Sequence, residues 1–194
     1  YYSEARKSDP ELLKQAQGDP MRLSFDELMY VSYINYSNET KMKYYKWATE
    51  HFASEWAAWN NAGAIAFALD DLDESERYLN VARELNPNNP DVLNNLGLLY
   101  MGREDYSLAQ YYFDEAKAQG STDADNNLVI LDLKRGNYDD ALKALKKRSC
   151  EFNLAYVQLA TGETNSAIRT LDCCLDQNAE VNYLRAIAYA RLGD

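Results

Sequence analysis

Histidine and cysteine are scarce in this sequence of 194 residues, which narrows the chemistry it can carry. His51 is the only histidine, so a metal site built from several histidines is excluded. A Ser-His-Asp mechanism would depend on that one residue at a predicted helix end, and we expect His51 to cap a helix or lie on the surface. The three cysteines form no Cys-x-x-Cys pair, which disfavours zinc binding and thioredoxin-like chemistry.

The spacing of the cysteines is compatible with a disulfide. Cys150 precedes one predicted helix of a hairpin, and Cys173 and Cys174 lie late in its antiparallel partner. Adjacent helical residues point about 100° apart, so only one of these two can face Cys150. We therefore expect either a disulfide between Cys150 and Cys173 or Cys174 in an oxidising compartment, or small buried thiols.

Positive charge and long apolar runs are also in short supply. With 20 lysines and arginines against 31 aspartates and glutamates, the net charge is −11. This balance disfavours nucleic-acid partners, because affinity for phosphates comes largely from lysine and arginine. The run from Ala62 to Leu69 is far shorter than the ~20 residues of a membrane span, so we expect no membrane insertion. The sequence has no glycine-rich phosphate loop and no acid pair with a defined pocket, so we expect no enzyme activity and no cofactor.

What the sequence does contain is a unit repeated about every 34 residues. The positions related by this shift are Tyr45, Leu79 and Phe113; Ala48, Ala82 and Ala116; Trp59 and Leu93; Gly63 and Gly97. Small residues at fixed positions let two helices approach to about 8–10 Å, and the large residues fill the space between helix pairs. The pattern predicts stacked helix-turn-helix units.

These positions resemble tetratricopeptide repeats, whose pattern runs Trp, Leu-Gly, Tyr, Ala, Phe, Ala and Pro. The matching residues are Trp59, Gly63, Ala82 and Pro87 in one copy and Leu96, Gly97, Tyr100, Ala109, Phe113 and Ala116 in the next. The resemblance implies an all-α fold, a right-handed superhelical solenoid. We expect a polar lead-in over 1–23 and an array over 24–194. Its units are a degenerate repeat 24–55, repeats 56–89 and 90–121, shortened repeats 122–149 and 150–177, and a half repeat 178–194.

Local signals predict where individual helices begin and end. Ser24 stands three residues before Glu27, the spacing of a capping box. Asn89 is a suitable cap for a helix that starts at Pro90. The predicted helices include 39–52, 90–103, 125–134, 138–147, 152–160, 166–177 and 182–192.

Paired asparagines recur at one position of the first helix of each unit. The pairs are Asn60-Asn61, Asn94-Asn95 and Asn126-Asn127. The resemblance implies that this position faces the concave groove, where amides can read a peptide backbone at roughly 0.5–1.5 kcal/mol per hydrogen bond. The alternative is that they satisfy neighbouring helix ends or loops.

The same register predicts an apolar groove around these amides. Its expected lining is Ala64, Phe67, Leu98, Met101, Ile130, Leu133, Phe152, Tyr156 and Tyr183, together with Asn60, Asn94 and Asn126. Such a groove suits a peptide or partner helix. Co-chaperone members of the family clamp a C-terminal carboxylate with lysine and arginine, whereas those positions here hold Asn60, Ala64 and Asn95, which does not support that specificity.

Six short segments follow one another in a recognisable order. They are 7–11 (KSDPE), 23–30 (LSFDELMY), 86–90 (NPNNP), 94–97 (NNLG), 150–155 (CEFNLA) and 170–173 (TLDC). This order resembles the C-terminal part of large Gram-negative envelope lipoproteins, in which tetratricopeptide repeats follow an OmpA-like peptidoglycan-binding domain. The resemblance implies a periplasmic, outer-membrane-associated setting, with peptidoglycan association through an upstream domain; a cytoplasmic location stays open. Because the sequence starts without methionine and stops at Gly193-Asp194, we expect a fragment of a longer protein.

The function predicted from these features is a non-catalytic scaffold that binds protein or peptide in its groove. A glycan-binding module is the alternative, because 16 tyrosines and 3 tryptophans on an acidic chain offer rings that can stack on sugars. A hydrolase is a distant third prediction.

Overall fold

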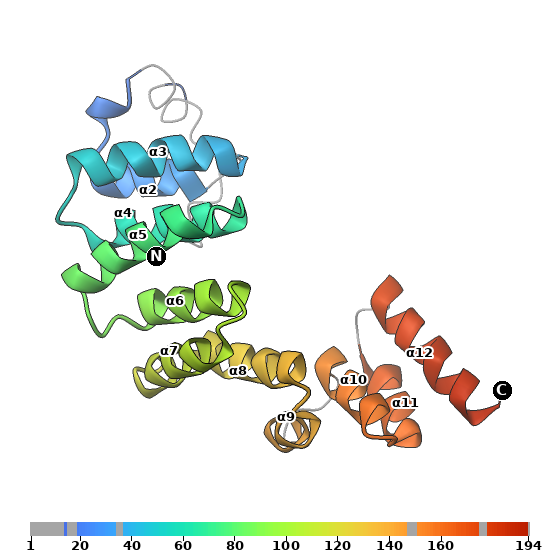
Figure 1. The fold of residues 1–194 in the computed structure, drawn as a ribbon. Coiled ribbons are helices and arrows are strands. Elements are labelled where there is room, and N and C mark those ends of the chain that lie inside the picture. The colour runs from blue at the N-terminus through green and yellow to red at the C-terminus, as the bar shows by residue number, and fades with distance from the viewer. Residues whose placement is uncertain (1–13, 15–18, 34–36, 147–150, 175–177, 194) are drawn as a thin grey trace. The chain divides into compact units, whose positions relative to one another are not determined.

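The computed structural model describes residues 14, 19–33, 37–146, 151–174 and 178–193. Over these residues the chain folds into α-helices and one short 3-10 helix, with no strand, which confirms the predicted all-α class. The elements are η1 (Pro20–Arg22), α2 (Phe25–Tyr33), α3 (Asn38–His51), α4 (Trp56–Ala68), α5 (Leu72–Leu85), α6 (Pro90–Gly102), α7 (Tyr106–Ala118), α8 (Thr122–Arg135), α9 (Tyr138–Leu145), α10 (Phe152–Ala160), α11 (Thr164–Cys173) and α12 (Ala179–Leu192) (Figure 1).

The chain divides into two compact units, Tyr1–Ala124 and Asp125–Asp194. Unit 1 holds the helix pairs α2 with α3, α4 with α5, and α6 with α7. Unit 2 holds most of α8 and all of α9 to α12. No helix among the described residues combines the length and apolar character needed to cross a bilayer.

Helix starts follow the capping residues that the sequence offers. The Ser24 backbone N–H donates to the Glu27 carboxylate at 2.9 Å, while the Glu27 N–H donates to Ser24 Oγ, so the predicted capping box is confirmed. Asn89 caps α6 ahead of Pro90, also as predicted. Asn178 accepts a bond from Val181 N and starts α12 at Ala179, three residues before the predicted start.

Helix ends in unit 2 also differ from the prediction. The segment 166–177 was expected to be helical, but α11 begins at Thr164 and ends at Cys173, because Cys174 has extended backbone. The expected start of α8 at residue 125 is wrong as well, since Ser121 Oγ accepts from Ala124 N and starts the helix at Thr122. Helices α3, α6, α9 and α10 match their predicted ranges within two residues.

Tight turns of one type close the helix hairpins. Asp70, Glu104, Gly136 and Gly162 each follow the first helix of a hairpin with φ between 61° and 84°, in the left-handed region. The next residue donates its N–H five residues back, as Asp71 N does to Ala66 O at 2.9 Å and Asp105 N to Tyr100 O at 2.9 Å. This is a Schellman-type ending, in which glycine is the usual left-handed residue. Its recurrence shows that the shortened hairpins of unit 2 keep the turn of the longer ones.

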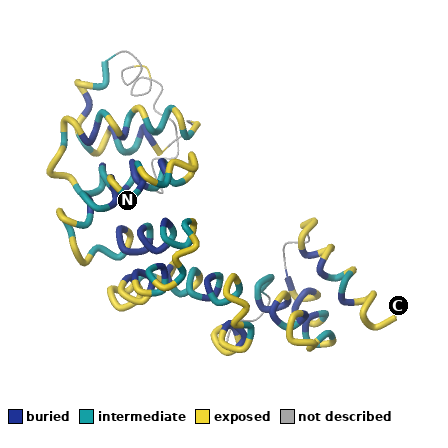
Figure 2. The backbone as a smooth tube through the Cα atoms, in the orientation of Figure 1, coloured by how far each residue is buried: buried dark blue, intermediate teal, exposed yellow. Residues whose placement is uncertain are grey.

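Buried side chains form clusters between neighbouring helices, and buried positions recur along the chain (Figure 2). Leu79, Leu93 and Phe113 are buried as the repeat pattern predicts. Gly63 lies so close to α5 that an added Cβ would be 2.6 Å from Leu79 Cγ, and one at Gly97 would meet the ring of Phe113. Trp59, expected in the core, is only partly buried, since its indole N–H donates to the Ala53 carbonyl at 2.9 Å.

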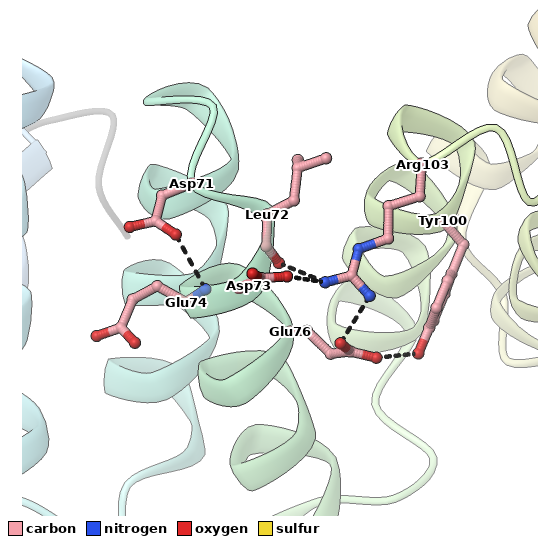
Figure 3. Close-up of polar contacts among 7 residues, drawn as sticks. All are labelled: Asp71, Leu72, Asp73, Glu74, Glu76, Tyr100 and Arg103. Atoms are coloured by element: carbon pink, nitrogen blue, oxygen red, sulfur yellow. Dashed lines mark hydrogen bonds and ion pairs between the residues drawn. The ribbon is translucent and has the colours of Figure 1, made fainter.

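A polar cluster joins α5 to α6 (Figure 3), and we call it the Glu76 cluster. Glu76 accepts a 2.7 Å bond from the Tyr100 hydroxyl and a 2.7 Å bond from the Arg103 guanidinium. Arg103 also donates to Asp73 at 2.7 Å and to the Leu72 carbonyl at 3.3 Å. The Tyr100 ring stacks on Tyr112 of α7 with centroids 5.4 Å apart. Three helices from two successive repeats are therefore tied together through one carboxylate.

The charges of this cluster stabilise one another. The hydrogen bond from Tyr100 and the nearby Arg103 guanidinium lower the pKa of Glu76 below its ordinary value of 4.5, although burial opposes this. Burial, followed by the contact with Glu76, raises the pKa of Tyr100 to about 12. At neutral pH the carboxylate is thus ionised and the phenol protonated, the pairing that their hydrogen bond requires.

Replacing Glu104, the left-handed residue after α6, by glycine should stabilise the protein. Glycine adopts this conformation without the steric cost that a Cβ imposes, and the Glu104 side chain forms no hydrogen bond or ion pair with the described residues that would be lost. We expect Glu104→Gly to raise the free energy of unfolding by about 0.5–1 kcal/mol, measured by urea denaturation. Gly162→Ala is the reverse control: its Cβ would meet no atom within 4 Å, so a loss of similar size would isolate the backbone effect. The backbone explanation would be contradicted if Glu104→Gly did not raise the free energy of unfolding, or if Gly162→Ala did not lower it.

Acid should weaken the Glu76 cluster. Because the folded pKa of Glu76 lies below its ordinary value, its stabilising contribution is present above about pH 4.5 and is lost as the pH falls through the folded value. We expect Glu76→Gln to lower stability by about 1–2 kcal/mol at pH 7, and to lower it less at pH 3. Urea unfolding at both values measures this difference. Glu84→Gln, at an exposed carboxylate of the same helix, is the control and should leave stability unchanged at both pH values. An equal loss at both pH values would show that ionisation of Glu76 does not matter.

Candidate functional site

The three predicted groove amides occupy different environments. Asn60 and Asn94 are only 7% and 9% exposed, whereas Asn126 is exposed. Asn60 Oδ1 accepts a 2.9 Å hydrogen bond from Asn95 Nδ2, which links α4 to α6. The expected row of equivalent, solvent-facing amides is therefore not what the structure has, because Asn60 and Asn94 are buried, Asn60 at its contact with Asn95 of α6. A ligand contact at Asn60, Asn94 or Asn126 stays a prediction.

The apolar groove residues predicted in unit 1 are half-buried. They are Ala64, Phe67, Leu98 and Met101. The ring of Phe67 lies over Gly102, where an added Cβ would be 2.8 Å from it. Phe67 thus fills the space between α4 and α6, which belong to successive repeats. The hydrogen bond between Asn60 and Asn95 joins the same two helices.

In unit 2 three of the predicted groove residues line a hollow between α10 and α12, which we call the aromatic hollow. It measures about 400 Å³ and is lined by Phe152, Tyr156, Ala179, Glu180, Tyr183 and Leu184. Phe152, Tyr156 and Tyr183 were all predicted for the groove from the repeat register. Of the other predicted residues of this unit, Ile130 and Leu133 are half-buried in α8. The hollow is the place where the structure gathers several predicted residues at one concave surface.

Two arginines hold the far part of α12 against its neighbours. Arg185 donates to the Leu171 carbonyl at 2.9 Å and lies 3.4 Å from the Asp172 carboxylate. Arg191 donates to the carbonyl of Leu159, near the end of α10. Phe152 and Ala179 are the first residues of α10 and α12, so the two helices start together at the hollow and meet again near their C-terminal ends. The walls of the hollow are therefore fixed by contacts outside it.

The hollow has one charged side chain, that of Glu180. The rings of Tyr156 and Tyr183 stay open to solvent, with 41% and 68% of their surface exposed. A concave, mostly apolar surface with one polar group for orientation is the usual chemistry of a binding site. Sequence reasoning missed Glu180 because it placed the start of the helix at residue 182; the signal that would have found it is the Asn178 cap.

The described residues offer little support for catalysis or metal binding. They include no group of three or more His, Cys, Asp or Glu side chains placed to hold a metal ion. His51 is exposed, stacks on Trp47 at 4.1 Å and contacts the Trp47 carbonyl through Nδ1, as expected for a residue at a helix end. The shifted pKa values of Glu76 and Tyr100 have a structural cause, since each group is the hydrogen-bond partner of the other.

The cysteines occupy two kinds of environment. Cys173 is disulfide-bonded, whereas Cys174 is a buried thiol outside any disulfide that donates to the Thr170 carbonyl at 3.3 Å. Cys150 lies outside the described residues, so its predicted pairing with Cys173 stays a prediction. Cys174 packs with Leu171 and Val181 in the core of unit 2 as a small buried thiol.

Comparison with known proteins identifies the repeats directly. Residues 43–90 and 71–124 match the family model described as tetratricopeptide repeat. No curated protein matches the chain.

Solved structures of low sequence identity have the same fold. A tetratricopeptide repeat protein from Parabacteroides merdae ATCC 43184 aligns with a TM-score of 0.74 and 18% identity over 95% of this chain and 78% of its own. A chain of the APC/C hetero-tetramer Cut9–Hcn1 aligns with a TM-score of 0.77 and 20% identity, over 96% of this chain and 39% of that one. YrrB, a tetratricopeptide repeat protein with an unusual peptide-binding site, aligns with a TM-score of 0.59 and 18% identity over 77% of this chain and 84% of its own. This chain therefore has the fold of tetratricopeptide-repeat proteins, and its residues 43–124 are tetratricopeptide repeats.

Proposed function

We propose that this chain is a non-catalytic scaffold that binds a protein segment or peptide in the aromatic hollow between α10 and α12. The observation that carries the proposal is the meeting of Phe152, Tyr156 and Tyr183 at one concave surface. Exposed tyrosines are enriched at protein interfaces, because they combine a large apolar ring with a hydroxyl that can form hydrogen bonds. Burying both rings would supply a central contact of the kind that dominates binding energy.

The rigidity of the hollow supports this proposal. Arg185 and Arg191 fix α12 to α11 and α10, so the binding surface exists before a ligand arrives. A preformed site avoids much of the entropy that a flexible loop would lose on binding. The peptide-binding site named for YrrB belongs to that protein, and supports here only the view that this fold can carry such a site.

The cell envelope is the setting we propose for this scaffold. The disulfide at Cys173 suits an oxidising compartment, since disulfides persist in the periplasm and are rare in the cytosol. The ordered sequence segments that resemble envelope lipoproteins support the same setting, and association with peptidoglycan through another domain belongs to this proposal.

A glycan-binding module is the second candidate, favoured by the same two exposed rings. Tyr156 and Tyr183 present faces on which a sugar could stack. A glycan array on the purified chain separates the two functions. Saturable sugar binding that is lost in Tyr183→Ala would favour the glycan-binding module. If no glycan on the array binds, that candidate function is rejected.

Thiol counting tests the proposed compartment. In protein purified from its host without reducing agent and then denatured, we expect one reactive thiol per chain, from Cys174. Three reactive thiols would exclude the bridge and remove this support for the envelope. Reduction before denaturation is the positive control, and should expose all three.

Peptide selection tests the binding function. We expect a phage library of random dodecapeptides to yield binders of the wild-type chain whose affinity falls at least tenfold for the double variant Tyr156→Ala/Tyr183→Ala, measured by fluorescence anisotropy. Both side chains are exposed, so the variant should keep the helical circular dichroism spectrum and melting temperature of the wild type.

Tyr189→Ala is the matched control, because Tyr189 is an exposed tyrosine of the same helix that does not line the hollow. It should leave affinity unchanged. Selected peptides that bind both variants as tightly as wild type would place the binding surface elsewhere, and failure to select any binder would count against a peptide-binding scaffold.

A further inference from the structure

We propose that the aromatic hollow selects peptides in which a lysine or arginine lies beside an apolar residue, with Glu180 pairing with the cation. This inference rests on the proposed function and adds the chemical class of the ligand. Phe152, Tyr156 and Tyr183 would hold the apolar side chain and the stem of the basic one, while the Glu180 carboxylate faces the charged end.

Charge complementarity favours a cationic ligand. Glu180 is the only charged residue that lines the hollow, it is exposed, and no ion pair holds it among the residues that the structure describes. The two arginines of α12 do not neutralise it, since Arg185 contacts Asp172 and Leu171, and Arg191 contacts Leu159. Among the described residues, the hollow therefore presents one negative charge that neither Arg185 nor Arg191 contacts.

The aromatic rings favour the same ligand. A lysine ammonium or an arginine guanidinium is attracted to the face of a tyrosine or phenylalanine ring. The opposite wall, α10, contains no charged residue at all in its sequence FNLAYVQLA, so nothing there competes for Glu180 or repels a cation. A cation entering between α10 and α12 would meet rings on both walls and a carboxylate on one.

Helix dipoles act in the opposite direction. Both α10 and α12 start at the hollow, and a helix N-terminus attracts anions with an effect of roughly twofold to fivefold on a binding constant. Glu180 already occupies the first turn of α12, and Asn178 accepts the bond from Val181 N. Glu180 therefore offsets the partial charge at the start of α12, and an anionic peptide would meet its full negative charge.

Three pools of labelled dodecapeptides test the inference. All are acetylated and amidated, carry random uncharged residues at the flanks, and have Leu-Lys-Leu, Leu-Gln-Leu or Leu-Glu-Leu at the centre. Fluorescence anisotropy with the full chain should give an affinity for the lysine pool about threefold above that for the glutamine pool and about tenfold above that for the glutamate pool. The preference should shrink in 1 M salt, because an exposed ion pair is screened.

Substitutions at Glu180 locate the preference. In Glu180→Gln the lysine and glutamine pools should bind alike, and in Glu180→Lys the glutamate pool should become the tightest. Glu163→Gln, at an exposed carboxylate of unit 2 that does not line the hollow, is the matched control and should keep the wild-type order. Unchanged circular dichroism would show that the variants fold.

The outcomes separate this inference from the function on which it rests. Equal binding of all pools by wild type, lost in Tyr183→Ala, would overturn the cation preference and leave the aromatic hollow as a peptide site. A lysine preference that survives in Glu180→Gln would also overturn it, by placing the selecting charge elsewhere. No binding of any pool would count against both.

Discussion

The close approach of Gly97 in α6 to Phe113 in α7 is the contact on which the rest of unit 1 depends. A methyl group at Gly97 would overlap the Phe113 ring, and Gly63 stands in the same relation to Leu79 one repeat earlier. Because no side chain separates the two helices there, the large residue of the second helix can pack directly on the backbone of the first. Each hairpin becomes a thin, rigid layer that must bury its outer faces against the next hairpin. The core consequently lies between successive layers, and the sequence repeats because each layer must meet the same packing requirement.

Shortening of the hairpins changes the surface that this arrangement offers. Helices α4 to α7 have 13 or 14 residues, whereas α9, α10 and α11 have 8, 9 and 10. The left-handed turn residue is kept in the short hairpins, so the loss falls on the helices themselves. In unit 1 the space between α4 and α6, the first helices of two successive hairpins, is filled by Phe67 over Gly102 and by the hydrogen bond between Asn60 and Asn95. In unit 2 the space between α10 and α12 stays open as the aromatic hollow.

Much of the fold follows from the sequence, because its period and its caps are local signals. The small and large residues at fixed spacing predict the hairpins, and Ser24, Asn89 and Pro90 predict where two helices start. The burial of Asn60 was beyond such reasoning, since its partner Asn95 lies 35 residues away and either member of each asparagine pair fits the same pattern. Phe152, Tyr156 and Tyr183 of the aromatic hollow had been expected to line a groove, and their contact with a ligand stays a prediction. Glu180 was not expected there, because an unrecognised asparagine cap displaced the expected helix start.

The position of Glu180 has both a folding role and a binding role. A carboxylate in the first turn stabilises α12 through the helix dipole, and this role alone would suffice to explain its presence. The dipole cannot explain why three aromatic rings gather around that turn, two of them exposed, since exposing large rings to water contributes nothing to the stability of the helix. A ligand that covers those rings would also bring its own charge close to Glu180 in a partly dehydrated site, where an ion pair is stronger than on an open surface. Folding thus fixes the carboxylate at the edge of the rings, and the rings give that carboxylate an influence on what can bind.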